Sequence, residues 1–187
     1  MSVTLPSETL TDSQILQYAN LLSIPHFVGV KMRDELSKSP RKKECGILNF
    51  QTHDQGGSHW TCWFKDQDRR YYFDSFAEQP PQELLEYLKT PEERINDSPV
   101  IRRSAVIVQH VNSNECGALS LFVLKCLSSG VPFSTILLML EKRFKLIPTP
   151  PLTIKTKETA PDVIYQDVSL RQSKQAKGRT RMEKTTS

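Results

Sequence analysis

One cysteine in the chain stands where a thiol could act as a nucleophile. Cys116 follows a polar run at residues 112–115 and precedes a segment, 117–124, that is apolar nearly all round. This pattern predicts a turn that becomes a core helix at the cysteine. At a helix start, unpaired N–H groups and the helix dipole favour a thiolate over a thiol. The same N–H groups can bind a developing oxyanion, for which the side-chain amide of Gln109 could supply a second donor.

A histidine and an aspartate flank a predicted β-hairpin. The aromatic-rich segments 59–64 and 70–74 are separated by the polar residues 65–69, which is the pattern of two antiparallel strands joined by a turn. A turn centred near residue 66 or 67 places His59 directly across from Asp74, on one face of the sheet.

Together these residues predict a Cys-His-Asp site for nucleophilic catalysis. Cys116 would attack a carbonyl carbon. His59 would hold the proton and pass it to the leaving amine, in an orientation fixed by Asp74. Gln109 would complete the oxyanion hole.

Each of these residues also has a purely structural interpretation. Cysteine is among the most buried residue types, so Cys116 could simply fill the core. His59 could be an ordinary strand histidine, Asp74 the start of a turn, and Gln109 a strand-end amide. Of the other three histidines, His110 is the second choice of base, because it lies beside Gln109.

Composition limits the class of protein. The 187 residues, 37% hydrophobic and 25% charged, suit one soluble domain with a polar appendage. The N-terminal residues have no secretory pattern, and no apolar stretch has the length of a membrane span. The four cysteines have no paired spacing, which argues against disulfides or a zinc site and for a reducing compartment. We therefore expect an intracellular protein that is not secreted.

The positive charge is concentrated at the C-terminus. The net charge is +4, and the segment from residue 171 contributes +5 through six basic residues and one acid, which leaves −1 for the rest. The basic residues are Arg171, Lys174, Lys177, Arg179, Arg181 and Lys184. We expect a domain at residues 1–148, ended by several prolines, and a disordered tail at 149–187. The tail could bind DNA weakly through phosphates, or could only solubilise or target the protein.

Further patterns indicate the elements that position the site. A capping box at Thr11–Gln14 predicts a helix that Pro25 stops. A short extended piece is predicted at 26–30, strands at 45–50 and 105–108, and helices at 80–89 and from 132 to 144. Residues 90–99 have the composition of a polar connection.

The motifs resemble those of a known protease family. The stretch Gly56–Trp60, then Asp74, then Gln109 with Asn112-Ser113 and Cys116-Gly117, resembles the adenovirus-type processing proteases, the adenain family, which has versions in Maverick/Polinton-like and adintovirus-like elements. The broader relatives are the proteases that process SUMO and other ubiquitin-like proteins. The chain order His, Asp, Gln, Cys is that of this clan. The resemblance covers about residues 11–144. Adenovirus enzymes usually have Glu in the third position, where this chain has Asp74, as is more typical of the SUMO-protease branch.

The resemblance implies a fold and a substrate. The fold would be a papain-like α+β core, with a mixed β-sheet packed on a central helix that begins at Cys116. The enzyme would cut after Gly-containing sites, Gly-Gly-x or Gly-x-Gly, in viral or mobile-element precursors in the host nucleus or virion. Narrow tunnels would admit only glycine beside the scissile bond, with Gly57 and Trp60 as substrate-binding residues.

The resemblance also implies regulators and leaves alternatives open. Family members need no cofactor for the chemistry but are activated by DNA and by a short peptide, disulfide-linked to a cysteine between the third triad residue and the glutamine. This chain has no cysteine between Asp74 and Gln109, so that covalent link is not expected. The alternatives are a protease for a cellular ubiquitin-like protein, an acetyltransferase on the same scaffold, and an inactive binder of a ubiquitin-like partner.

Overall fold

A five-stranded mixed sheet forms the frame of the molecule. The computed structural model describes residues 2–37, 39–56, 59–96 and 101–155. The strand order is β2-β3-β4-β5-β6, with antiparallel pairing of β3, β4 and β5 and parallel pairing of β2 and β6 at the two edges. The strands are β2 (Phe27–Met32), β3 (Lys43–Asn49), β4 (Trp60–Asp66), β5 (Arg69–Phe73) and β6 (Arg102–Arg103).

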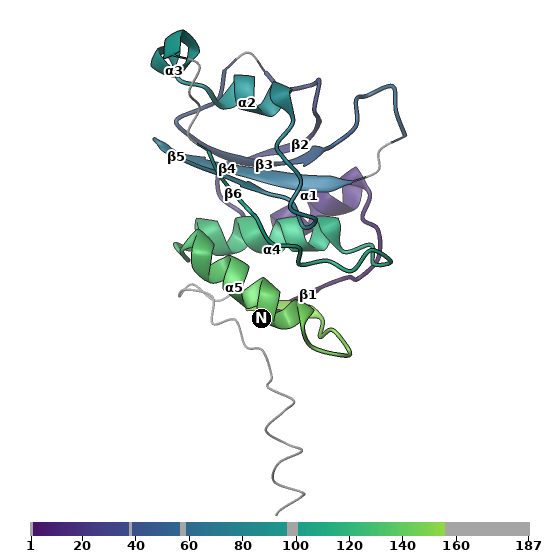
Figure 1. The fold of residues 1–187 in the computed structure, drawn as a ribbon. Coiled ribbons are helices and arrows are strands. Elements are labelled where there is room, and N and C mark those ends of the chain that lie inside the picture. The colour runs from purple at the N-terminus through teal and green to yellow at the C-terminus, as the bar shows by residue number, and fades with distance from the viewer. Residues whose placement is uncertain (1, 38, 57–58, 97–100, 156–187) are drawn as a thin grey trace, which may run out of the picture.

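Helices cover both faces of the sheet (Figure 1). Below it lies α4 (Cys116–Ser128), of which eleven of thirteen residues are buried, with α5 (Phe133–Phe144) beneath. Above it lie the short helices α2 (Gln82–Leu88) and α3 (Pro91–Asn96). The main core joins the sheet to α4, α5 and α1 (Asp12–Leu21), and a smaller core around Trp63 and Tyr72 joins it to α2. The predicted α+β class, with a mixed sheet packed on a helix that begins at Cys116, is confirmed.

Several local predictions are also confirmed. Thr11 is the N-cap of α1, and its side chain accepts from the Gln14 N–H while the Gln14 side chain accepts from the Thr11 N–H. This reciprocal pair is the predicted capping box. Helices α2 and α5 and strands β2, β3, β4 and β5 also lie within a few residues of their predicted positions.

The hairpin forms with a register two residues away from the predicted one. Asp66 pairs with Arg69 and Cys62 with Phe73, around a two-residue turn in which Gln67 has φ +54°. Extended outward, this register sets His59 across from residue 76 and not from Asp74, so the predicted direct pairing was wrong. A shift of two residues keeps every side chain on its face of the sheet, because the side-chain period of a strand is two.

The strand predicted at residues 105–108 is wrong. That segment belongs to no strand and contains a bend at Val106, and the sixth strand is the two-residue β6 before it. The Val108 N–H donates instead to the Ser75 carbonyl at 2.9 Å. Ile107 is 54% exposed while Val108 is buried, so the apolar run does not lie wholly in the core. The polar connection at 90–99 contains the helix α3.

The folded part of the chain continues beyond residue 148. Strand β7 (Leu152–Lys155) pairs antiparallel with β1 (Ser2–Leu5) in a separate two-stranded sheet, and neither strand was predicted. Leu152 and Ile154 are buried in the main core beside α4. The expected domain end therefore lies too early. The rest of the expected tail, with its basic residues from Arg171 to Lys184, lies outside the described residues.

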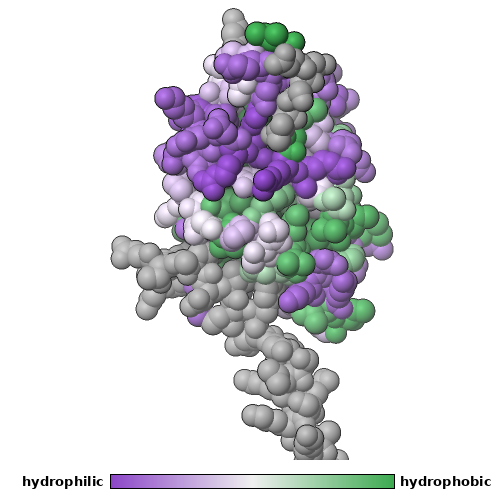
Figure 2. Space-filling view, turned by 60° about the vertical axis from the view of Figure 1, so that its left-hand side comes forward, coloured by the Kyte–Doolittle hydropathy of each residue, from purple (hydrophilic) through white to green (hydrophobic). Residues whose placement is uncertain are grey.

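Surface polarity differs between the two ends of the molecule. Figure 2 shows hydrophilic surface gathered over the upper part, at the height of α2 and α3, and apolar surface lower down, toward α5. Within the described ranges, none of the helices combines the length and apolarity needed to cross a bilayer.

Candidate active site

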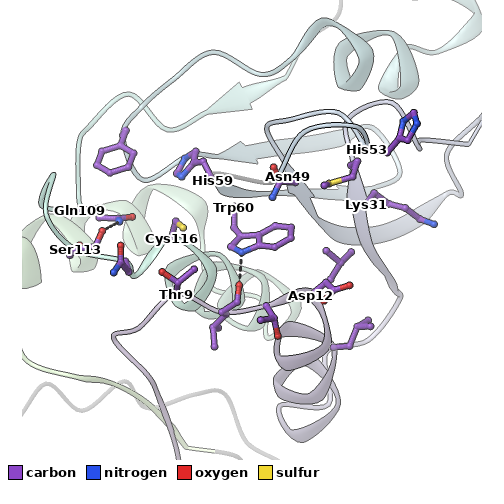
Figure 3. Close-up of a pocket in the computed structure, with 18 of the residues that line it drawn as sticks. Thr9, Asp12, Lys31, Asn49, His53, His59, Trp60, Gln109, Ser113 and Cys116 are labelled. Atoms are coloured by element: carbon purple, nitrogen blue, oxygen red, sulfur yellow. Dashed lines mark hydrogen bonds between the residues drawn. The ribbon is translucent and has the colours of Figure 1, made fainter.

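The Cys116 thiol lies at the wall of a groove of about 760 Å³, at the first residue of α4 (Figure 3). The first bond within the helix runs from the Leu119 N–H to the Glu115 carbonyl at 2.8 Å. The N–H groups of residues 116–118 therefore precede the helical hydrogen bonds, as at any helix start. Gly117 is tightly packed, since an added Cβ would lie 3.2 Å from Leu10 and 3.3 Å from Trp60.

His59 is held by a buried carboxylate. Its Nε2 lies 2.8 Å from Oδ2 of Asp74, which is 0% exposed. The other carboxylate oxygen, Oδ1, accepts the Phe76 N–H at 2.7 Å, and the Phe76 ring packs on the imidazole with centroids 5.2 Å apart. The hydroxyl of Ser104 bonds both the N–H and the carbonyl of Asp74, at 2.9 and 2.8 Å. Ser104 thus holds the backbone of Asp74, the Phe76 N–H holds its carboxylate, and the carboxylate in turn orients the His59 imidazole.

The electrostatics of His59 favour its charged form. Burial lowers the pKa of the imidazole, but hydrogen bonds to Asp74 and Cys116 and the charges of both groups raise it to about 9 from its ordinary 6.5. Because Nε2 is committed to Asp74, Nδ1 is the ring nitrogen left for Cys116. At neutral pH the site therefore favours an imidazolium beside the sulfur.

The Gln109 amide has one possible orientation. Its Oε1 accepts from the Ser75 hydroxyl at 2.7 Å, and its Nε2 donates to the Ser113 carbonyl at 2.7 Å. A carbonyl cannot donate, so the nitrogen must face Ser113. One Nε2 proton then remains, and Gln109 lines the groove together with Cys116 (Figure 3). Ser75, buried and next to Asp74, was not predicted.

Trp60 forms the wall on the other side of Cys116 (Figure 3). Its Nε1–H donates to the Leu10 carbonyl at 2.7 Å, which joins the ring to the segment before α1. Thr9, Leu10 and Thr11 line the groove there, although nothing in their sequence pattern indicated a site. Gly57, the other predicted substrate-binding residue, lies outside the described residues.

The rival residues lie away from the sulfur or in unsuitable surroundings. His53 also lines the groove, but on the far side of Trp60 from Cys116 (Figure 3), and its Nδ1 lies 2.5 Å from Oδ2 of Asp34. His110 is exposed, stacks on Phe144 at a centroid distance of 4.3 Å, and does not line the groove. Cys45, Cys62 and Cys126 are each at most 1% exposed, and burial raises the pKa of all three thiols, to about 12 for Cys45 and Cys126. Among the four cysteines, only Cys116 lines the groove.

Comparison with known proteins finds likeness in structure only. No protein-family model and no curated protein sequence matches the chain. The solved structures that are similar include the ASFV pS273R protease, with a TM-score of 0.49 and 19% identity over 75% of this chain and 68% of that one. The Se-Met form of that protease has a TM-score of 0.46 and 17% sequence identity, over the same 75% of this chain and 68% of that one. The SUMO protease Ulp1, with its catalytic cysteine oxidised to a sulfinic acid, has a TM-score of 0.43 and 14% sequence identity. The match covers 73% of this chain and 75% of that one. Because each TM-score lies below 0.5, function has to be inferred from the site itself.

Proposed function

We propose that this chain is a cysteine endopeptidase with Cys116 as its nucleophile. The observation that carries the proposal is the His59 imidazole, shared between the Cys116 thiol and the fully buried Asp74 carboxylate. A cysteine that only fills the core needs no imidazole beside it and no groove. The joint arrangement supports a thiolate–imidazolium pair poised toward a bound carbonyl.

The chemistry follows from the placement of these groups. The Cys116 thiolate attacks the scissile carbonyl carbon, and the new oxyanion is bound by the Cys116 N–H and the free Nε2 proton of Gln109. His59 then gives its Nδ1 proton to the leaving amine as the C–N bond breaks, which leaves a thioester on Cys116. Neutral His59 next takes a proton from water, whose oxygen attacks the thioester. The C–S bond then breaks, which restores the Cys116 thiolate and releases the acid product, and that product loses its remaining proton to solvent.

For the substrate, we propose a chain with glycine beside the scissile bond, in viral or mobile-element precursor proteins. The support is the resemblance of the motifs and the closeness of the groove walls at the nucleophile. There the Trp60 ring is hydrogen-bonded to the Leu10 carbonyl and packs close to α4 at Gly117. Even a methyl group on Gly117 would be tightly packed against the ring. Activation by DNA or by a peptide stays a prediction.

A second candidate is a protease for a cellular ubiquitin-like protein. It is favoured by Asp74 in the third triad position, where the adenovirus branch usually has Glu. Both candidates use the same chemistry and differ in whether the substrate is recognised by its short sequence or by a folded modifier.

A substrate panel tests the proposal and separates the candidates. Peptides Leu-x-Gly-Gly-x and their Leu-x-Gly-Ala-x counterparts are compared with full-length SUMO precursors, all without acyl-CoA. We expect cleavage after Gly-Gly, with strong discrimination against the Ala peptide. Cleavage of the folded precursor alone would favour the second candidate. In a separate reaction that contains acyl-CoA and an acceptor protein, acyl transfer together with no hydrolysis of any peptide in the panel would contradict the peptidase proposal.

A further inference from the structure

A buried ion pair lies directly behind the nucleophile. Arg143 of α5 is 2% exposed, and its Nη2 and Nη1 lie 2.5 and 3.4 Å from the two carboxylate oxygens of Glu115. Its Nε–H donates to the Pro150 carbonyl at 2.8 Å. Glu115 is 7% exposed and immediately precedes Cys116, as the N-cap residue of α4.

The pair changes what the helix start can bind. A carboxylate near a helix start is attracted by the positive end of the helix dipole and by the unpaired N–H groups there. The Glu115 side chain makes no hydrogen bond to those groups, because its two oxygens face the Arg143 fork. The carboxylate is thereby kept off the N–H groups beside Cys116, and its negative charge is neutralised.

Stability alone does not account for this arrangement. Burying an arginine and a carboxylate costs solvation that their attraction only partly offsets, and apolar replacements of similar size are often as stable. A negative charge one residue from a thiolate nucleophile, in contrast, would weaken that thiolate unless it were paired.

We propose that Arg143 is a positioning residue for Cys116: by binding both oxygens of Glu115, it reserves the positive end of α4 for the sulfur and for the oxyanion. The catalytic part of this inference rests on the proposed function. The electrostatic part concerns only the environment of the thiol.

The test compares alkylation of Cys116 by anionic iodoacetate and by neutral iodoacetamide, followed by peptide mapping. In Arg143→Met the unpaired carboxylate repels iodoacetate, and we expect the iodoacetate-to-iodoacetamide rate ratio to fall about threefold or more. In Glu115→Gln, which keeps the size of the side chain, Arg143 is left uncompensated and the ratio should rise. The double variant should return to the wild-type ratio.

A matched control separates this effect from general loss of stability. The buried Arg70 of β5 forms another two-bond fork, with the partly buried Glu93, at 2.5 Å for both contacts, and Arg70 does not line the groove. Arg70→Met should lower the melting temperature but leave the alkylation ratio unchanged. On a cleaved peptide, Arg143→Met should lower kcat about tenfold or more with little change in KM, and the double variant should recover part of that loss.

Wild-type alkylation ratios in Arg143→Met and Glu115→Gln would overturn the proposal. Should Arg143→Met fail to fold, Glu115→Gln alone decides, since an unchanged ratio there contradicts the charge argument. The ratios need no peptidase activity. If the wild type cuts no peptide but the ratios shift, the proposed function fails and the placement of Arg143 stands. If the wild type cuts peptides but the alkylation ratios do not shift, the proposed function stands and the role assigned to Arg143 fails.

Discussion

The His59 imidazole and the Asp74 carboxylate meet beyond the last paired residues of the β4–β5 hairpin, with Nε2 and Oδ2 2.8 Å apart. Asp74 follows β5 directly, and its carboxylate is already bound by the Phe76 N–H at 2.7 Å and placed by Ser104. The hairpin end therefore presents a fixed, buried anion to the histidine, which is the arrangement needed to keep the ring charged and correctly turned.

This geometry predicts unequal losses on substitution of the two residues. His59→Ala should cost roughly 10⁴-fold or more in kcat, nearly as much as loss of the nucleophile, because the groups act as a unit. In Asp74→Asn the Phe76 N–H holds the amide oxygen at the Oδ1 position, so the NH₂ group faces Nε2 and favours the wrong ring tautomer. We expect a smaller loss, roughly 10²–10⁴-fold, since the amide still orients the ring. Steady-state kinetics of both variants check this, and wild-type activity in His59→Ala would exclude His59 as the base.

A second prediction concerns stability against pH. The pKa of His59 is raised to about 9 from 6.5 by Asp74 and Cys116, against the effect of burial. The resulting stabilisation is fully present below pH 6.5 and is lost as the pH rises through 9, to a limit of about 3 kcal/mol. Urea unfolding of wild type and His59→Gln between pH 6 and 10 measures it, and the variant should lose much less stability over that range. His53→Gln is the control: Asp34 also raises the pKa of His53, but the His53 side chain is 70% exposed, so solvent screens that pair and it adds little stability. Parallel curves for wild type and His59→Gln would contradict the prediction.

A third prediction concerns the amide of Gln109. Ser75→Ala removes the hydroxyl that donates to Oε1 and frees the amide to turn. We expect kcat to fall roughly 10- to 100-fold with KM nearly unchanged, because an oxyanion donor acts in the transition state. Ser128→Ala is the matched control: its hydroxyl also makes a 2.7 Å bond, to the Leu124 carbonyl, at the far end of α4. Equal kcat in both variants would mean that Ser75 does not position the amide.

A fourth prediction concerns the C-terminal boundary. Truncation after Lys155 keeps β7, whereas truncation after Ile147 removes Leu152 and Ile154 from the core and the Pro150 carbonyl from Arg143. Loss of two buried aliphatic side chains costs about 3–6 kcal/mol. We expect 1–155 to unfold at the wild-type temperature and to cut peptides, and 1–147 to be strongly destabilised. A fully stable 1–147 protein would show that the β1–β7 sheet is dispensable.

Most of the main sheet could be predicted, and so could the meeting of His59, Asp74 and Cys116, since both depend on local signals. The Thr11 capping box, the alternation within the hairpin and the apolar run after Cys116 each act within a few neighbouring residues. The hairpin register was wrong by two residues, yet His59 and Asp74 still meet, because a shift of two preserves the face of the sheet.

The parts that were missed depend on contacts between distant segments. Strands β1 and β7 have four residues each and pair across the whole domain, with no turn to reveal them. The 105–108 run is apolar, but the Val108 N–H bonds to Ser75 and not to a neighbouring strand. Arg143 lies 28 residues from Glu115, and nothing near either residue indicates the pair. A single sequence carries no local signal for such contacts.

The central claim, that Cys116 is the nucleophile of a peptidase, is tested most directly by a peptide that ends in Gly-Gly with a vinyl methyl ester in place of the scissile bond. The account predicts one adduct per protein, mapped by mass spectrometry to Cys116, absent in Cys116→Ala and much slower in His59→Ala. An adduct on Cys45, Cys62 or Cys126, or reaction at Cys116 that does not depend on His59, would contradict it.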